Sequence, residues 1–425
     1  MAKDSESAGG SRVRMFHGWW IVAVAFCAQL LALGCSVAVY GLFIPVLTDE
    51  FGASFMTANL GLSMLGVVMA LAGALVGPLL DRRSIRGIMV GGAAISGLAF
   101  LLMSYATELW QLAVLFGVAV AFGAAMFGPL AANTVIAKWF SRNRGRAVGI
   151  ASMGPPTGGL LLSPLVGVMM SSYGWRPTLL VFAGLHAILI PFLWFAIRNR
   201  PEDMNLLPDG ARAMGSGATV GRGWTTADVF RSRNFWVLAL AFGAVGAVAG
   251  AFNANVIPYA RDIGIGLTEA SLFISAIGGT AIVGTVVFGT LADRMNITRL
   301  LLVSFLMQAL AFFTLRSVAP GYGLLMLVVL VFGLAAGALM PLMVAAVGRA
   351  FGPVSFGRVM GFIGPVTLPF AFVGPPLTGW IRQTTGSYLP AFDLFFAVFV
   401  VCCGIVMMLK VPRATESAEE NLRTG

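Results

Sequence analysis

Long apolar stretches alternate with short polar loops along almost the whole of this 425-residue chain. Twelve of these stretches reach the roughly 18 residues that mark a membrane-spanning helix. The predicted spans are Gly18–Ile44, Ser54–Leu80, Gly87–Tyr105, Leu109–Ala137, Gly145–Ser171, Pro177–Ile197, Asn234–Tyr259, Thr268–Ala292, Thr298–Arg316, Gly321–Gly348, Gly357–Ile381 and Tyr388–Lys410. The pattern therefore predicts an all-α membrane protein with twelve transmembrane helices.

One long polar stretch interrupts this pattern. It runs from Arg198 to Arg233, is rich in Gly, Arg, Pro and Asp, and separates the sixth span from the seventh. We therefore expect a six-helix bundle at residues 1–197, a linker at 198–233 and a second six-helix bundle at 234–425.

The two halves are related by an internal repeat. Gly77 and Asp81 have counterparts 212 positions later in Gly289 and Asp293 (289 − 77 = 293 − 81 = 212). Further pairs at the same offset are Pro129 with Pro341, Gly145-Arg146 with Gly357-Arg358, Gly149 with Gly361, Pro164 with Pro376, and Gly174 with Gly386. A repeat of this length predicts two pseudo-symmetric bundles.

Charge changes the picture by fixing an orientation. Charged residues are 10% of the chain against roughly 25% in soluble domains, and the net charge is +10. Of the 27 Lys and Arg residues, all but Arg176, Arg261, Arg316 and Arg382 fall on one side of the predicted spans, which we call the basic end. The positive-inside rule places the basic end, both termini and the linker in the cytoplasm. The positive charge therefore predicts membrane topology and not a nucleic-acid partner.

Two charged stretches at the basic end are candidates for gating. The first covers Gly77–Arg86 and includes Asp81, Arg82 and Arg86. The second contains Gly289, Asp293 and Arg294, and the matched arginines Arg146 and Arg358 are grouped with these candidates. Anchoring at the membrane surface alone would explain the arginines, but it would not explain an aspartate in matched register in both halves.

These stretches carry a family resemblance. Gly77–Arg86 resembles the loop between the second and third helices of the major facilitator superfamily, and the Asp293 copy stands where that family repeats the loop. His17-Gly18-Trp19-Trp20, the stretch from Lys138 to Gly149, and Thr385-Gly386-Ser387-Tyr388 resemble its monocarboxylate-porter branch of bacterial type. The resemblance implies a secondary active transporter in which two six-helix halves expose a midplane site alternately to each side.

The sequence departs from that branch at one position. Bacterial members often place Gly-Arg midway along the eighth helix, where this chain has Gly284-Thr285. The eleventh span also lacks the lysine of oxalate/formate exchangers, and no Lys or Arg lies in the middle third of any predicted span. A bound carboxylate would then depend on hydrogen bonds and helix N-termini, or the cargo would be neutral when bound.

Polar side chains within the spans are candidates for binding cargo. They are Gln29, Asn253, Asn255, Thr285 and Thr367, whose amides and hydroxyls could bind a carbonyl or carboxylate oxygen. The alternative for each is a hydrogen bond to a neighbouring helix.

Two titratable side chains inside spans allow two interpretations each. Asp393 could take a coupling proton, or it could be a carboxylate near a helix N-terminus that reaches the outer interface. His186 could relay protons, or it could bond a neighbouring helix. The sequence leaves both open.

The most concrete prediction is a proton-coupled transporter of a small monocarboxylate or related organic acid, in a bacterial inner membrane. The alternative is efflux of a neutral or amphipathic compound. No nucleotide-binding motif, metal-ligand cluster or disulfide framework is found, so we expect no cofactor, no metal and no enzymatic activity. The predicted partners are a small-molecule substrate, protons and membrane lipid, and we expect a monomer.

Overall fold

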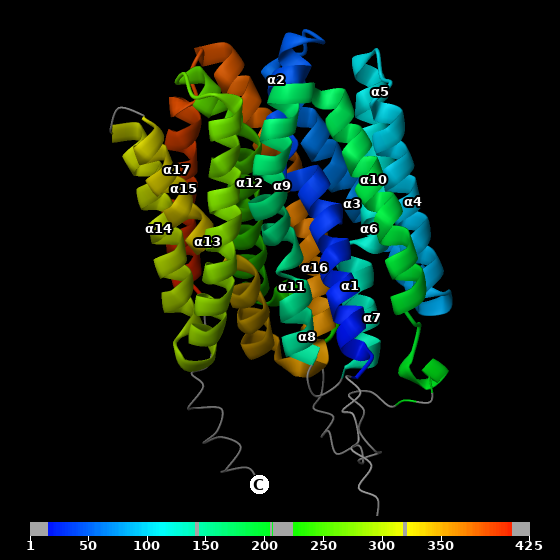
Figure 1. The fold of residues 1–425 in the computed structure, drawn as a ribbon. Coiled ribbons are helices and arrows are strands. Elements are labelled where there is room, and N and C mark those ends of the chain that lie inside the picture. The colour runs from blue at the N-terminus through cyan, green and yellow to red at the C-terminus, as the bar shows by residue number, and fades with distance from the viewer. Residues whose placement is uncertain (1–15, 141–143, 205, 207–223, 318–320, 410–425) are drawn as a thin grey trace, which may run out of the picture.

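The computed structural model describes residues 16–140, 144–204, 206, 224–317 and 321–409 (Figure 1). The side chains of residues 81, 82, 144, 145, 293, 317, 353, 354 and 356–358 lie outside this description. Within these ranges the regular secondary structure is helical, with no strand.

The first bundle contains the helices of the first six predicted spans. They are α1 (Gly18–Leu33), the π-helix η1 (Gly34–Ala38), α2 (Tyr40–Asp49), α3 (Phe55–Arg82), α4 (Ile85–Met103), α5 (Leu109–Val114), the π-helix η2 (Leu115–Val120), α6 (Ala121–Phe127), α7 (Pro129–Trp139), α8 (Arg144–Ala151), α9 (Gly154–Tyr173) and α10 (Trp175–Ala196).

The short helices η3 (Pro201–Met204) and α11 (Thr226–Arg231) lie in the predicted linker. The second bundle contains α12 (Arg233–Asp262), α13 (Leu267–Arg294), α14 (Ile297–Ser317), α15 (Tyr322–Ala336), α16 (Leu339–Thr385) and α17 (Leu389–Met407). Helix α16 bends at Gly352, whose φ of 73° favours glycine, and so holds parts of both the tenth and the eleventh spans.

Eleven described helices are long and apolar enough to cross a membrane. The fifth predicted span is not one of these eleven, and it is divided into α8 and α9 at Ser152 and Met153. Gly154-Pro155-Pro156 opens α9, and a proline ring suits the start of a helix because it has no N–H to satisfy. With α8 and α9 as the twelfth path, the all-α fold predicted from the sequence is confirmed.

The fourth and tenth spans are broken at related places. The fourth changes direction at Gly128, just before Pro129, and the tenth is interrupted at Gly337 and Ala338, before Pro341. Such breaks are tolerated inside a membrane where neighbouring helices cover the freed backbone groups.

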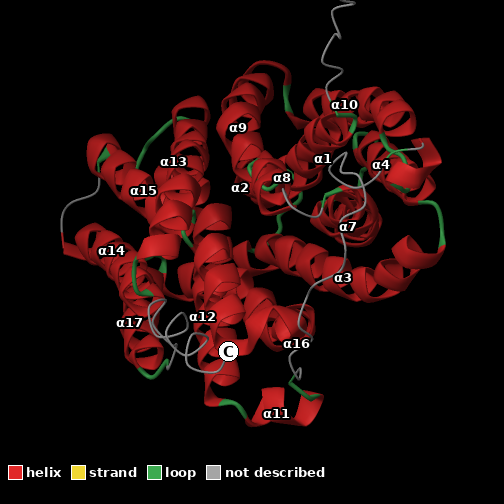
Figure 2. Cartoon of the chain, turned by 90° about the horizontal axis from the view of Figure 1, so that it is seen from below, coloured by secondary structure: helices red, strands yellow, loops and turns green. Residues whose placement is uncertain are grey.

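The two bundles lie side by side, as the view along the helices shows (Figure 2). In the first, α4 packs on α10 and α1 packs on α9; in the second, α14 packs on α17 and α12 on α16. The bundles meet along three lines, α9 with α13, α3 with α16, and α2 with α12. Close approach of helices through glycine is the usual way that membrane helices gain packing energy.

Candidate functional site

The described contacts between the bundles gather toward the end opposite the basic end. Asp49 of α2 forms an ion pair with Arg261 of α12 at 3.2 Å, and the hydroxyls of Ser171 and Thr268 lie 3.1 Å apart. Helices α1 and α7, which form the basic-end halves of the first and fourth spans, pack on helices of their own bundle. The molecule is therefore closed at the end away from the basic end.

A pair of amides joins the bundles at this closed end. Asn59 Nδ2 donates to Asn255 Oδ1 at 3.1 Å, and Asn255 Nδ2 donates to Asn59 Oδ1 at 2.8 Å. The second N–H of each amide donates to a carbonyl of its own helix, Phe55 O or Ala251 O, at 2.9 Å. Both side chains are at most 2% exposed. Every N–H of the pair is thus bonded, as buried polar groups require.

Tyr388 completes this network from the second bundle. Its hydroxyl donates to Asn255 Oδ1 at 3.4 Å, and its ring is almost fully buried.

Two lines of contact between the bundles are related by the repeat. We call the contact of α3 with α12 and α16 the amide seam (Phe55, Asn59, Asn255, Gly379 and Arg382), and the contact of α9 with α13 the glycine seam (Pro156, Gly167, Ser271 and Gly278). A Cβ atom on Gly379 would lie 3.0 Å from Asn59 Nδ2, and one on Gly167 would lie 2.5 Å from Ser271 Oγ. Gly379 stands 212 positions after Gly167, and Ser271 stands 212 positions after Asn59 (379 − 167 = 271 − 59 = 212). The repeat therefore sets where the bundles touch.

Backbones approach closely along the glycine seam. Gly278 lies against the carbonyl oxygen of Pro156, and a Cβ atom there would lie 2.7 Å from Leu160 N. No side chain larger than hydrogen fits at such a position without displacing backbone.

The two predicted asparagines of α12 have different surroundings. Asn255 lies in the amide pair, whereas Asn253 Nδ2 donates to Ala249 O of its own helix at 2.9 Å and is only partly buried. In this conformation the amide of Asn255 is occupied by protein partners. Its predicted role in substrate binding stays a prediction.

The two predicted threonines are bonded to backbone. The Thr285 hydroxyl lies within bonding distance of Ala281 O, at 2.9 Å, and of Gly337 O at the break in the tenth span, at 3.0 Å. Thr367 donates to Gly364 O of its own helix at 2.9 Å. Among the described contacts, no hydrogen bond joins any two of the five predicted substrate-binding side chains.

Gln29 differs from the other four. It is 2% exposed, and its Nε2 atom has no hydrogen-bond partner in the described part of the chain. Ala32 of the same helix lies against Gly128, just before α7, and the Cβ of Gln29 lies against Gly154 at the start of α9. Helix α1 therefore runs beside the N-terminal ends of both α7 and α9. A buried N–H without a partner is costly, so this amide is a donor available to a ligand or a water molecule.

The start of α7 supplies further donors. The helix begins at Pro129 without a side-chain cap, so the N–H groups of Leu130 and Ala131 have no acceptor within their own helix. Asn133, one turn further, has a buried Oδ1 atom without a partner. A helix start inside a membrane favours a carbonyl or carboxylate oxygen. These groups are polar sites within the first bundle that are not fully bonded among the described residues.

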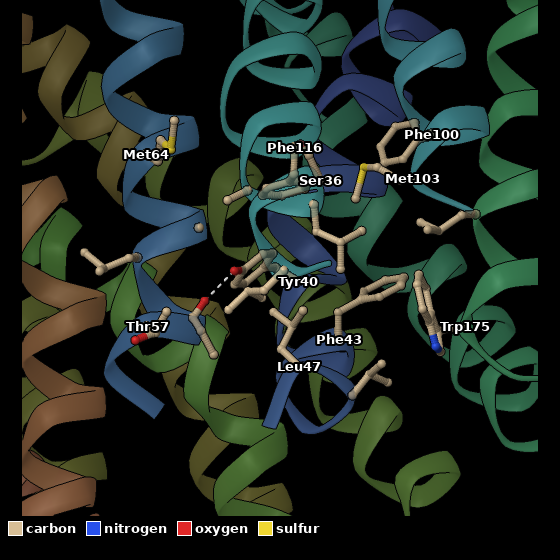
Figure 3. Close-up of a pocket in the computed structure, with 18 of the residues that line it drawn as sticks. Ser36, Tyr40, Phe43, Leu47, Thr57, Met64, Phe100, Met103, Phe116 and Trp175 are labelled. Carbon is tan, nitrogen blue, oxygen red and sulfur yellow. Dashed lines mark hydrogen bonds between the residues drawn. The ribbon is translucent and has the colours of Figure 1, made fainter. Parts of the chain in front are cut away.

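A cavity of about 460 Å³ lies in the first bundle, in the half away from the basic end (Figure 3). Its wall is apolar and includes Phe43, Met64, Phe100 and Phe116, together with Phe372 from the second bundle. Mostly apolar walls of this size are typical of pockets for small hydrophobic ligands.

The polar groups at this cavity are already bonded. The hydroxyl of Tyr40 donates to Ala58 O at 2.5 Å, that of Ser36 donates to Ala32 O at 2.5 Å, and Trp175 Nε1 donates to a carboxylate oxygen of Glu50 at 2.6 Å. The cavity thus suits an apolar ligand better than a charged one.

At the basic end, two basic residues cap helices at matched positions. Lys138 Nζ donates to Leu80 O at the end of α3, at 3.2 Å, and Arg349 donates to Ala292 O and Met295 O at the end of α13. The carbonyls of Leu80 and Ala292 are 212 positions apart. Cations are favourable at helix C-termini, so these contacts tie α3 to α7 and α13 to the tenth span.

The predicted gating residues are described only in part. The side chains of Asp81, Arg82, Asp293 and Arg358 lie outside the described residues. A Cβ atom on Gly289 would lie 3.6 Å from Pro341 Cβ, whereas nothing lies within 4 Å of such an atom on Gly77.

The three described arginines among these candidates lie on the surface of the basic end. Arg86 stands 4.4 Å from the centre of the Trp194 ring, Arg146 stands 5.9 Å from that of Trp19, and Arg294 is exposed. The two ring contacts are within the range of cation–π attraction. The gating role of all these residues stays a prediction.

The two motif stretches of the first bundle pack on each other. The ring of His17 lies 5.4 Å from that of Trp139, and Trp19 lies 5.2 Å from Phe140. His17 Nε2 lies 2.9 Å from Ala196 O at the end of α10. This aromatic cluster joins the basic ends of the first, fourth and sixth spans.

Asp393 and His186 lie away from both seams. Asp393 forms an ion pair with Arg316 at 3.0 Å, and both side chains are more than half exposed. His186 Nδ1 lies 2.8 Å from Phe182 O of its own helix, and its ring packs against Phe100 and Phe127. The coupling role predicted for Asp393 stays a prediction.

Sequence reasoning missed Asn59 and Gly379 of the amide seam, and Tyr388, which donates to Asn255 of that seam. One signal was available for two of them, because Gly379 and Asn59 stand 212 positions from Gly167 and Ser271. The repeat does not reveal Tyr388, whose hydroxyl reaches Asn255 from the start of another helix.

Comparisons with known proteins agree with this architecture. The family model described as Major Facilitator Superfamily matches residues 24–315 and 245–424. Human monocarboxylate transporter 11 is 27% identical over 414 residues, which cover 94% of this chain and 84% of that protein. Rat monocarboxylate transporter 4 is 27% identical over 410 residues, which cover 94% and 85%.

Two solved structures share the fold. They are crystal structures of a bacterial homolog to the human lysosomal transporter Spinster, in inward-facing unoccupied and inward-facing occupied conformations, with TM-scores of 0.69 and 0.66. Both are 18% identical to this chain, and each match covers 92% of this chain and 95% or 93% of the other. The family match spans nearly all of the described helices, so this chain belongs to the major facilitator superfamily and is a membrane transporter, not an enzyme.

Proposed function

We propose that this transporter moves a small monocarboxylate or related organic acid together with a proton, by alternating access between its two bundles. The observation that carries the proposal is the one-sided placement of the contacts between the bundles. The Asn59–Asn255 pair and the Asp49–Arg261 pair both lie away from the basic end. With the basic end in the cytoplasm, as the distribution of Lys and Arg predicts, this arrangement corresponds to an inward-facing state.

The substrate class is inferred from relatives and supported by the donors of the first bundle. The relatives named above are monocarboxylate transporters, at 27% identity. Gln29 Nε2 has no partner in the described part of the chain, and the N–H groups of Leu130 and Ala131 have no acceptor within α7, so these groups could bond carboxylate oxygens. We propose Asn253 and Thr367 as further polar contacts, and Asn255 and Thr285 as residues that reach cargo only when their present bonds break.

Proton coupling is supported by the lack of Lys and Arg in the middle third of the predicted spans. A carboxylate without a basic partner at mid-membrane is costly, whereas the protonated acid is neutral. The proton can therefore travel on the cargo itself. If the coupling proton instead binds to the protein, we propose that the Asp393 carboxylate carries it.

The basic end is proposed as the second gate. Asp81 and Asp293 would bind the helix ends there, with Gly77 and Gly289 allowing close approach and Arg82, Arg86, Arg146, Arg294 and Arg358 binding carbonyl ends or lipid phosphate. We expect Asp81→Asn to slow transport while expression stays near that of the wild type. Unaltered flux in that variant would count against this role.

The proposed function is tested in proteoliposomes. We expect a labelled small monocarboxylate, with lactate and pyruvate as the probes, to accumulate inside when the outside is acidic, and less so when the two sides have equal pH. No entry above protein-free vesicles would overturn the proposal. We also propose a monomer in a bacterial inner membrane, with bundle boundaries near residues 197 and 234.

A second function is favoured by the apolar cavity. Efflux of a neutral or amphipathic compound would use a wall such as that of the cavity beside Tyr40, where each described polar group is already bonded. Ala113→Phe would narrow this cavity, while Val114→Phe adds the same ring on a neighbouring side chain that is 48% exposed. Loss of transport of an amphipathic dye in the first variant alone would support efflux, and an equal effect of both would argue against it.

A further inference from the structure

We propose that Asn59 is a positioning residue for transport, and that its amide pair with Asn255 sets how often the outer end is closed. The proposal rests on the alternating-access function above and goes beyond it, because it assigns the control of one gate to one pair of side chains. The outer end here means the end away from the basic end.

The bonding of the pair makes it a two-state contact. The same two side chains form both hydrogen bonds across the seam, at 2.8 and 3.1 Å, so separation of the helices breaks both together. The remaining N–H of each amide donates within its own helix, to Phe55 O or Ala251 O, so these two bonds do not cross the seam. The two bonds across the seam therefore form or break together. A transition between an open and a closed state requires a contact with two such discrete arrangements.

The surrounding backbone holds the pair in place. A Cβ atom on Gly379 would lie 2.5 Å from Phe55 O, and one on Gly41 would lie 2.8 Å from Ala254 O. Helices of both bundles thus approach on two sides of the pair without intervening side chains. Asn59 is 0% exposed in this arrangement, so water cannot replace one bond while the seam remains closed.

Among the residues that the structure describes, the glycine seam has no equivalent of this contact. Ser271, which the repeat matches to Asn59, donates its hydroxyl to Thr268 O of its own helix at 2.6 Å. The polar contact described across that seam joins Ser171 and Thr268, and it is exposed. The amide pair is therefore specific to one of two otherwise related seams.

The test measures the outer end directly, without cargo. Spin labels on Tyr105→Cys and Gln383→Cys, both exposed at the outer end of different bundles, report the distance between the bundles in nanodiscs. The four native cysteines are free and are replaced in all variants. Labels on Glu202→Cys and Met295→Cys report the basic end in the same way.

We expect Asn59→Ala and Asn255→Ala each to raise the ratio of outer-open to outer-closed molecules about tenfold, because each removes the same two hydrogen bonds. Each single variant also leaves the other amide buried without its partner, so the double variant should raise the ratio no more than either single one. Ser171→Ala, on the glycine seam, is the matched control and should change the ratio little. Unchanged distances, or effects of the two alanine variants that add, would overturn the proposal.

A second variant keeps the test independent of folding defects. Asn59→Asp with Asn255→Asp places two carboxylates face to face, which repel when both are charged but can share a proton. We expect the outer end to be open at about pH 8 and closed at about pH 5 in this one protein. An outer distance that does not depend on pH would contradict the proposal. Because no cargo is used, failure of monocarboxylate uptake would overturn the proposed substrate and leave this result untouched.

Discussion

The two seams between the bundles use matched positions for different chemistry. On the amide seam, Gly379 lies against α3 beside Asn59, and Arg382 stands over the ring of Phe55 at 5.2 Å. On the glycine seam, Gly278 lies against the backbone of α9, Gly167 lies against the Ser271 side chain, and the polar groups bond within their own helices or at the surface. The repeat thus fixes where the helices approach, and single residues decide what each contact does.

This difference predicts opposite sensitivities. The glycine seam should respond most to added volume at Gly278, because the backbones that meet there cannot rearrange. The amide seam should respond most to lost hydrogen bonds and charges, because side chains form the polar contacts across it.

The largest effect is expected from Gly278→Ala. The new methyl group would lie 2.7 Å from Leu160 N and closer still to the carbonyl oxygen of Pro156, so we expect a loss of about 1–3 kcal/mol in stability and little transport. The matched control is Gly246→Ala, where nothing lies within 4 Å, and where alanine should stabilise a helix by about 0.5–1 kcal/mol. Thermal unfolding in detergent measures both, and equal effects would refute the close packing of this seam.

A rescue experiment separates side-chain from backbone contacts. Gly167→Ala would meet Ser271 Oγ and Cβ, at 2.5 and 2.6 Å, so Ser271→Gly should restore the stability of that variant. Gly379→Ala would meet the backbone of Phe55, at 2.5 Å from its oxygen, so Asn59→Ala should not rescue it. Rescue on both seams, or on neither, in thermal unfolding would show that the two contacts do not differ in this way.

A smaller effect is expected from the charges of the amide seam. Arg382 pairs with Asp262 at 2.6 Å with side chains 22% and 29% exposed, while Arg261 pairs with Asp49 at 3.2 Å with side chains 43% and 65% exposed. We expect Arg382→Gln to cost about 1 kcal/mol, since it also loses the ring of Phe55, and Arg261→Gln to cost about 0–0.5 kcal/mol. The difference should persist at high salt, which screens exposed pairs first.

The smallest effect is expected from Asp393→Asn, which lies outside both seams. Its exposed pair with Arg316 contributes about 0–1 kcal/mol, and proton-driven uptake should change little if the proton travels on the cargo. Uptake that no longer responds to a pH gradient would instead assign the coupling proton to Asp393. Uptake of the probe under reversed gradients measures this directly.

Much of the fold followed from the sequence, whereas little of the site did. Apolar length alone located the spans, because the bilayer requires it of each helix separately. The division of the fifth span at Ser152 and Met153 was not predicted, although Gly154-Pro155-Pro156 marked the place. A proline pattern shows that a helix is perturbed but does not show whether it bends or ends.

Which residues belong to the candidate site depended on the face of the helix on which each side chain lies. Asn253 and Asn255 are two positions apart and therefore point about 200° apart around α12. The first bonds only its own helix among the described contacts, and the second bonds a residue 196 positions earlier in the chain. Hydropathy treats the two residues alike, so the sequence could nominate both without separating them.

The sequence by itself determined the spans, the duplication and the basic end, because hydropathy, repetition and loop charge are properties of short segments. Only the tertiary structure decided that the bundles are in contact away from the basic end, and that one seam closes through amides and the other through glycine. Those outcomes depend on which helix faces meet across the molecule. The residues around Asn59 in the chain do not show that its partner is Asn255, and the residues around Asn255 do not show that its partner is Asn59.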